Sequence, residues 1–140
     1  FFTVYGPWGR PDMAPFIFAN AINKDLSIDV FNHGLMKRDF TFINDIVESI
    51  SRLIGAEIKD LFKVYNIGNN KPVSLLYFIE CLEESFGKKV NKNMKEMQPG
   101  DLVETWADTL ELSEIINFLP RTNIEEGVKS FVDWYKNYYK

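Results

Sequence analysis

Short apolar runs, several of them ending at Gly or Pro, alternate along this chain with longer stretches whose apolar residues recur at helical spacing. Residues 1–5 form the first run, and Tyr5-Gly6-Pro7 ends it as a turn. Residues 27–32, 40–43 and 64–67 are further strand candidates, and residues 90–97 alternate more weakly. No repeat and no low-complexity linker is present. The pattern predicts an α/β fold: one small mixed lobe of several helices and short strands over residues 1–140.

Capping residues and apolar stripes predict four or five helices. The expected boundary residues are Asp12 and Lys24 for the first helix, Asp45 with Glu48 for the second, and Ser74 with Gly87 for the third. Two more helices are expected at about 109–118 and 123–139. The last has a single apolar stripe formed by Ile124, Val128, Phe131, Val132 and Tyr135.

Composition excludes several classes of protein. Apolar residues make up 46% and charged residues 26%, which is ordinary globular usage and fits neither a disordered tail nor a membrane protein. The net charge of −4 argues against a nucleic-acid partner. Cys81 is the only cysteine, so neither a disulfide framework nor a cysteine metal site is expected, and a reducing, cytoplasmic location is the simplest expectation.

Taken singly, the polar candidates are weak. Arg10 and Arg38 lie in or beside expected loops, where binding groups concentrate, but for each of them alone a solvated surface role is the better explanation. His33 reads as a turn residue, because no Ser, Cys or acidic partner is spaced to form a catalytic triad or a metal site with it. The adjacent acids Glu83-Glu84 and Glu125-Glu126 are expected on solvated helix faces.

The order of the motifs is more specific than any one of them. The motifs are Phe1-Phe2-Thr3-Val4-Tyr5-Gly6-Pro7, Arg10-Pro11-Asp12-Met13-Ala14, Arg38-Asp39-Phe40-Thr41-Phe42-Ile43-Asn44-Asp45-Ile46, Tyr65-Asn66-Ile67-Gly68, Gln98-Pro99-Gly100-Asp101 and Trp106-Ala107-Asp108. In this order they resemble the carboxyl-terminal half of extended, Rossmann-type short-chain dehydrogenases/reductases that act on nucleotide sugars. Residues 1–14 are most similar to the UDP-glucuronate 4-epimerases of bacterial surface-polysaccharide synthesis, in the NAD-dependent epimerase/dehydratase family.

The resemblance implies that NAD is bound mainly by a Rossmann half upstream, which also supplies a catalytic Tyr-x-x-x-Lys pair. In this chain no Tyr is followed four residues later by Lys, and no glycine-rich phosphate loop occurs. The chain opens on a strand-like run, so upstream sequence is expected to be missing. We therefore expect a substrate-binding lobe without catalytic residues. On its own it should be inactive and can be monomeric, whereas the parent enzyme is expected to form a homodimer.

By the same resemblance, a UDP-sugar is the expected ligand, and its polar contacts can be assigned. Arg38 is the expected clamp on the diphosphate, because a guanidinium fork matches phosphate oxygens. Arg10 is a second cation in the pocket, and Asp101 accepts hydrogen bonds from the ribose hydroxyls. Gln98 stands where many relatives have an Arg that contacts the diphosphate. One cation is therefore missing or supplied elsewhere, and Arg38 has to neutralise more of the diphosphate charge. Thr3 lies where galactose-type epimerases commonly have Asn, and its hydroxyl can bond the carboxylate of a uronic acid.

Three apolar positions complete the expected site. Phe2 resembles the aromatic residue that packs near the nicotinamide ring, although a core role fits it equally well. The backbone around Val30 and Phe31 resembles the segment beside uracil. The alternatives that remain open are another UDP-hexose epimerase, a nucleotide-sugar 4,6-dehydratase, a fragment that binds UDP without turnover, and a folded piece that binds nothing.

Overall fold

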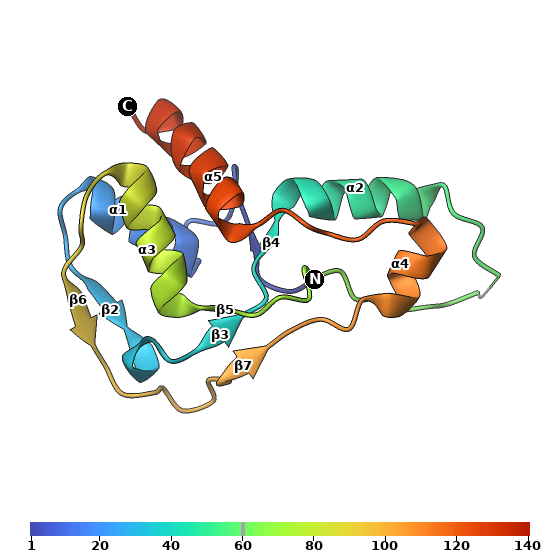
Figure 1. The fold of residues 1–140 in the computed structure, drawn as a ribbon, viewed down its shortest axis with the longest axis horizontal. Coiled ribbons are helices and arrows are strands. Elements are labelled where there is room, and N and C mark those ends of the chain that lie inside the picture. Colours follow the sequence, from blue (N-terminus) through green and yellow to red (C-terminus); the bar gives the residue numbers. More distant parts are fainter. Residues whose placement is uncertain (60) are drawn as a thin grey trace.

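A computed structural model describes residues 1–59 and 61–140. It has an elongated shape, with α1, α3 and α5 at one end and α2 and α4 at the other (Figure 1). The helices are α1 (Ala14–Asn23), α2 (Ile43–Ile54), α3 (Leu75–Phe86), α4 (Leu110–Ile116) and α5 (Ile124–Tyr138). The strands are β1 (Val4–Tyr5), β2 (Ile28–Val30), β3 (Lys37–Arg38), β4 (Thr41–Phe42), β5 (Val73–Ser74), β6 (Lys92–Met94) and β7 (Glu104–Thr105). The expected α/β lobe is confirmed.

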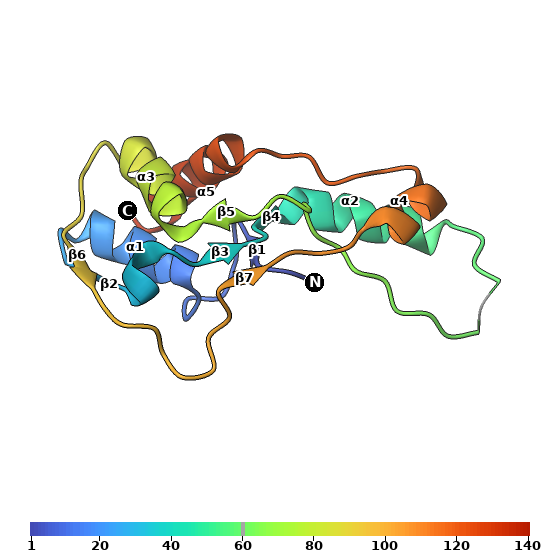
Figure 2. The same cartoon turned by 60° about the horizontal axis from the view of Figure 1, so that its bottom comes forward.

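The strands are short and form three small sheets in the described part of the chain. β1 pairs in parallel with β4, and β2 in parallel with β6. β3 lies between β5, which is antiparallel to it, and β7, which is parallel. Figure 2 shows this last sheet midway between the two groups of helices. The sequence did not predict β3, β5 or β7, because a two-residue strand carries too little alternation to be recognised.

Two apolar clusters hold the lobe together. The larger lies among α1, α3 and α5, where Phe78, Phe131 and Val132 are fully buried. The smaller lies between α2 and α4 and contains Ile46 and Leu112. The predicted stripe of α5 is buried in full, because its five apolar side chains face α3 and α1. Periodicity at 3.6 residues therefore located this helix and its buried face.

Among the predicted helix boundaries, those of α3 and the end of α1 are confirmed. The Ser74 hydroxyl accepts a hydrogen bond from the Tyr77 amide at 3.2 Å, and Gly87 ends α3 in the left-handed conformation. Lys24 follows α1 directly.

The predicted caps of α1 and α2 are wrong. Met13 precedes α1 and Phe42 precedes α2, and neither side chain caps its helix. The carboxylate of Asp12 is bound to Arg10. Asp45 lies inside α2, where its carboxylate accepts the amides of Arg121 and Thr122. In both cases the carboxylate that was expected to cap a helix binds another donor. For Asp12 this is the neighbouring Arg10, and for Asp45 it is backbone distant in sequence.

Two further predictions are corrected. Residues 64–67 form no strand, because their only described strand-like contact is one hydrogen bond from the Phe2 amide to the Ile67 carbonyl at 3.2 Å. Glu83 is not solvated: it is 2% exposed and accepts hydrogen bonds from Lys89, Lys92 and the Val90 amide. In the described chain, no helix combines the length and apolar character needed to cross a bilayer.

Candidate functional site

A pocket of about 270 Å³ contains the two residues expected to hold a diphosphate and a ribose. We call it the Arg38 pocket. It is lined by Thr3, Met13, Ala14, Pro15, Phe18, Asp29, Phe31, Met36, Arg38, Phe40, Leu75, Gln98 and Asp101. Arg38 and Asp101 are separated by more than sixty positions in sequence and share this one cavity.

Arg38 is positioned by β3 and holds the segment that bears Asp101. Its Nη1 donates to the carbonyl of Lys37 and to that of Leu102, both at 2.8 Å. The Lys37 amide donates to the Val103 carbonyl at 2.9 Å, next to the β3–β7 pairing. The Asp101 amide closes a turn on Gln98 at 3.2 Å, and Gly100 in that turn has φ +89°. Arg38 therefore fixes the loop that carries the acid opposite it.

Asp39, the next residue, binds two other segments of the chain, at residues 69–70 and at Ala107. It is fully buried, and its carboxylate accepts the amides of Asn69 at 2.9 Å, Asn70 at 3.0 Å and Ala107 at 2.9 Å. A carboxylate with several amide donors satisfies both the buried charge and the buried N–H groups. At Gly68 an added Cβ would lie 2.7 Å from the Asp39 carboxylate, so the backbone must stay bare there.

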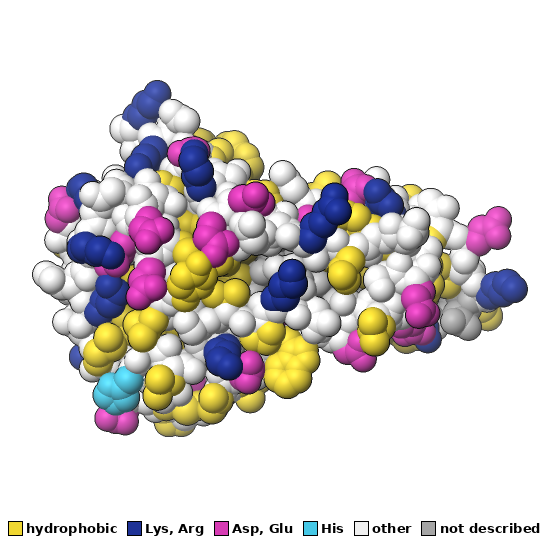
Figure 3. Space-filling model, in the orientation of Figure 1, with side chains coloured by type: hydrophobic (Ala, Val, Ile, Leu, Met, Phe, Trp, Pro, Cys, Tyr) yellow, Lys and Arg dark blue, Asp and Glu magenta, His cyan; other side chains and the backbone are white. Residues whose placement is uncertain are grey.

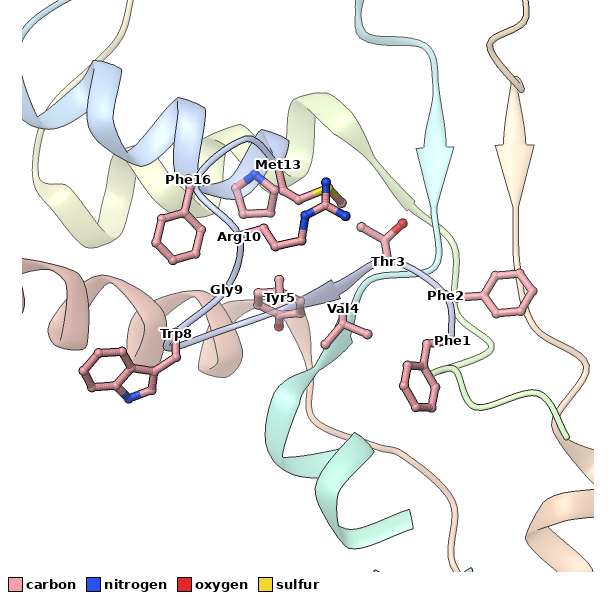
Figure 4. A pocket seen from close by; sticks show the side chains of 11 residues that line it. Phe1, Phe2, Thr3, Val4, Tyr5, Trp8, Gly9, Arg10, Met13 and Phe16 are labelled. Atoms are coloured by element: carbon pink, nitrogen blue, oxygen red, sulfur yellow. The ribbon is translucent and has the colours of Figure 1, made fainter. Parts of the chain in front are cut away.

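A second pocket of about 460 Å³ adjoins the first, since Thr3, Met13 and Pro15 line both. We call it the Arg10 pocket. It is lined by Phe1, Phe2, Thr3, Val4, Tyr5, Trp8, Gly9, Arg10, Met13, Pro15 and Phe16 (Figure 4). Its walls are mainly aromatic and aliphatic, and Arg10 is its one cation among the described residues. Such a wall with one placed charge suits a flat or sugar ring that carries an anion.

Arg10 is paired with Asp12, two residues later. Its Nε donates to Asp12 Oδ1 at 3.1 Å and its Nη2 to Oδ2 at 2.5 Å. The hydrogen bond to Asp12 raises the pKa of Arg10, and the same hydrogen bond lowers the pKa of Asp12. Both groups are therefore charged throughout the neutral range.

The predicted site residues fall into two groups and one exception. Phe31, Arg38 and Asp101 line the Arg38 pocket, Phe2 and Arg10 line the Arg10 pocket, and Thr3 lines both. Val30 lines neither: its side chain is fully buried in the larger core, and its carbonyl accepts the Lys95 amide at 2.9 Å. Only its neighbour Phe31 reaches the cavity.

Sequence reasoning did not assign Asp29 to the site, and named Gln98 only as a missing cation. Both line the Arg38 pocket. Asp29 is the outward residue of β2 between buried Ile28 and Val30, so alternation in that strand was the available signal. Its Oδ1 accepts from Asn93 on β6 at 3.1 Å.

The described residues contain no group of three or more His, Cys, Asp or Glu side chains that could hold a metal ion. His33 lies in a turn, as predicted, with Nε2 at 3.1 Å from Glu96.

On the face shown in Figure 3, cationic and acidic side chains are interspersed. The polar groups among the residues that line the two pockets include two guanidinium groups, two carboxylates, the Gln98 carboxamide and the hydroxyls of Thr3 and Tyr5, and the other walls are mainly apolar.

Comparison with known proteins agrees with this geometry. Residues 1–68 match the model of the NAD dependent epimerase/dehydratase family. The chain is 52% identical to Protein CapI of Staphylococcus aureus, with 100% of this chain and 47% of that protein covered. It is 41% identical to a probable UDP-glucuronate 4-epimerase of Rhizobium meliloti, with 100% of this chain and 46% of that protein covered. The chain thus spans about half the length of the curated relatives it matches.

Among solved structures, a UDP-glucuronic acid 4-epimerase from Bacillus cereus in complex with UDP-glucuronic acid and NAD superposes with a TM-score of 0.91. Its sequence is 33% identical, and the match covers 99% of this chain and 44% of that one. Fold, motif order and sequence identity lead to the same conclusion: this chain belongs to the NAD dependent epimerase/dehydratase family and corresponds to the carboxyl-terminal part of its Rossmann-type members.

Proposed function

We propose that this chain is the nucleotide-sugar-binding lobe of an NAD-dependent UDP-glucuronate 4-epimerase, which interconverts UDP-glucuronate and UDP-galacturonate for surface polysaccharides. The observation that carries the proposal is the shared pocket of Arg38 and Asp101, together with its adjoining pocket around Arg10. Arg38 and Asp101 in the first pocket match the diphosphate and the ribose diol of a UDP-uronate. Arg10, in the adjoining pocket that shares Thr3, matches the carboxylate of its sugar.

The Arg38 pocket takes the UDP end. The diphosphate carries about two negative charges, and a guanidinium keeps its own charge while donating from several N–H groups. Nη1 of Arg38 donates to two carbonyls and Nη2 donates to the Met36 sulfur at 3.5 Å. The N–H of Nε and the second N–H of Nη2 are the donors left for the phosphate oxygens. The Asp101 carboxylate accepts from the ribose hydroxyls, and Phe31 gives the uracil an apolar neighbour.

The Arg10 pocket takes the sugar end. The uronate carboxylate is bound by the guanidinium of Arg10 and the hydroxyl of Thr3, since both line this pocket and Figure 4 shows the Arg10 side chain reaching toward Thr3. A neutral hexose has no carboxylate to pair with the Arg10 guanidinium, so this end of the site contributes to selectivity for uronic acids.

The residues present fit one part of NAD. The aromatic wall of the Arg10 pocket, which Phe2 helps to line, suits the flat nicotinamide ring. NAD when bound supplies the acceptor and donor of the hydride that inversion at C4 requires. The work of this lobe is to orient the sugar and to exclude water, while the rest of NAD and the catalytic pair belong to residues upstream.

The activity is tested on the full-length protein that carries this chain, supplied with NAD. We expect UDP-glucuronate to be converted to UDP-galacturonate, measured by resolving the two uronates chromatographically, and UDP-glucose to react far more slowly. The 140-residue chain alone should show no turnover. Equal rates with UDP-glucose, or epimerisation by the 140-residue chain, would contradict the proposal.

Arg38→Ala in the full-length protein should weaken UDP binding by about 1.5–3 kcal/mol, the range for hydrogen bonds to charged groups. Isothermal titration calorimetry with UDP measures the change. Arg38→Lys is the matched control, because it keeps the charge without the fork and should lose less affinity. Unchanged affinity in Arg38→Ala would remove Arg38 from the site.

A further inference from the structure

The backbone of Arg10 is fixed by the turn that follows it. The Met13 amide donates to the Arg10 carbonyl at 3.2 Å, and Pro11 occupies the second position of this turn. Met13 is also the residue directly before α1, and its carbonyl accepts the Phe16 and Ile17 amides. The turn with Arg10 and Asp12 is thus a rigid extension of α1.

The residues before Arg10 are held as well. The Trp8 ring contacts those of Trp134 and Tyr138 on α5, with centroids 5.2 and 4.9 Å away. Trp8 has φ 62°, a conformation that a bulky residue adopts only where its surroundings enforce it. An added Cβ on Gly9 would lie 2.7 Å from the Phe16 ring, so the chain passes close over α1.

The side chain of Arg10 is largely exposed, and among the described residues its guanidinium is held by Asp12. Asp12 takes the Nε proton and one Nη2 proton along one edge of the fork. A guanidinium has five N–H donors, so the opposite edge, at Nη1 and Nη2, stays available for a second carboxylate. Among the described residues Arg10 makes no other hydrogen bond, and its guanidinium lies between Met13 and Thr3 (Figure 4).

We propose that Asp12 is a positioning residue for sugar selectivity: it holds the Arg10 fork by one edge so that the other edge meets the carboxylate of a uronic acid beside Thr3. The inference rests on the proposed function, in which Arg10 contacts that carboxylate. Because Asp12 stays ionised, the fork is oriented before the substrate arrives, and less side-chain freedom is lost on binding. A sugar without a carboxylate gains nothing from this orientation.

The test is Asp12→Asn in the full-length protein with NAD. We expect the KM for UDP-glucuronate to rise by about three- to fivefold, the upper range for an exposed ion pair of good geometry. The kcat should stay within about twofold, and the affinities for UDP and UDP-glucose should not change, because Arg38 and Asp101 are untouched. Asp12→Glu should restore most of the loss. The matched control is Asp133→Asn, which removes an exposed carboxylate paired with Lys129 at 2.7 Å on α5.

A double variant separates positioning from a general structural effect. If Asp12 acts through Arg10, adding Asp12→Asn to Arg10→Gln should change KM no further. An additional loss in the double variant, an equal loss for UDP-glucose, or an unchanged KM in Asp12→Asn would each overturn the inference while leaving the proposed function intact. A wild-type protein that neither binds nor epimerises UDP-glucuronate would overturn both.

Discussion

At the scale of single residues, Tyr5 and Gly127 constrain each other by close contact. The Tyr5 hydroxyl is buried without a hydrogen-bond partner among the described residues, and burial raises its pKa, with Asp45 adding to the effect. A Cβ added to Gly127 in α5 would lie closer than 3.0 Å to that hydroxyl. The glycine therefore serves the close approach of α5 to β1.

Gly127→Ala should destabilise the protein by about 1–3 kcal/mol, because overpacking here exceeds the gain that alanine brings to a helix. Urea unfolding followed by circular dichroism measures the free energy. Tyr5→Phe removes the nearest clashing atom and no hydrogen bond, but Cζ of the ring would still lie 2.7 Å from the added Cβ. The double variant should therefore recover part of the loss. Gly55→Ala is the control: its φ is −87° and its nearest neighbour would lie at 3.7 Å, so no loss is expected.

The site residues show how far a sequence can lead. Arg38 and Asp101 were assigned from the order of motifs, and the structure brings both to one pocket. The assignment of their roles stays a prediction. The Arg10–Asp12 pair escaped notice because Asp12 also had the position of a helix cap, and only tertiary geometry decides which donor a carboxylate binds.

At the scale of elements, Glu83 joins α3 to β6. Its carboxylate, 2% exposed, accepts from Lys92 Nζ at 2.5 Å, the Val90 amide at 2.9 Å and Lys89 Nζ at 3.0 Å. Burial disfavours the charged form, but the hydrogen bonds from Lys92, Val90 and Lys89 outweigh it and lower the pKa of Glu83 from 4.5. The folded protein thus holds this carboxylate ionised more strongly than the unfolded chain does.

A lowered pKa contributes stability that is present above the unfolded value and is lost as the pH falls through the folded value. The free energy of unfolding of the wild type should therefore fall below about pH 4.5 more steeply than that of Glu83→Gln. Urea titrations from about pH 7 to about pH 3 compare the two. Glu84→Gln, at the exposed neighbouring position, should keep the wild-type slope. Parallel profiles for wild type and Glu83→Gln would contradict the assignment.

Helices were found from the sequence more reliably than strands, for a physical reason. α3 and α5 carry their hydrogen bonds and apolar stripes within themselves, so local spacing identifies both. β3 and β7 are two residues long and pair across more than sixty positions, so no local pattern specifies them. Residues 64–67 show the converse: β-branched and apolar composition predicted a strand where the described chain provides almost no ladder.

At the scale of the whole molecule, one region stands out by its exposed apolar side chains. Ile54, at the end of α2, is 82% exposed, and Phe62 and Val64 in the segment after it are 85% and 72% exposed. Figure 1 shows this region at the end of the molecule away from α5. Several large apolar side chains left exposed on one stretch of chain favour association.

The isolated 140-residue chain should therefore self-associate as its concentration rises, because contact between two molecules removes this apolar surface from water. Sedimentation velocity at increasing concentration measures the effect. The double variant Phe62→Ser and Val64→Ser should sediment more nearly as a monomer, whereas Leu26→Ser, a change at a singly exposed leucine elsewhere, should not. An equal shift for both variants would show that this region is not the cause.

The three backbone amides that donate to the Asp39 carboxylate suggest where the sequence of such a lobe can change during evolution. These amides belong to Asn69, Asn70 and Ala107. The chain between α2 and Asn69, and the chain between Asn70 and Ala107, donate no hydrogen bond to this carboxylate in the described structure. Insertions or deletions in those stretches leave the amides where they are. We therefore expect evolution to tolerate changes of loop length between these attachment points while the wall behind Arg38 keeps its shape, and to tolerate almost no replacement of the carboxylate itself.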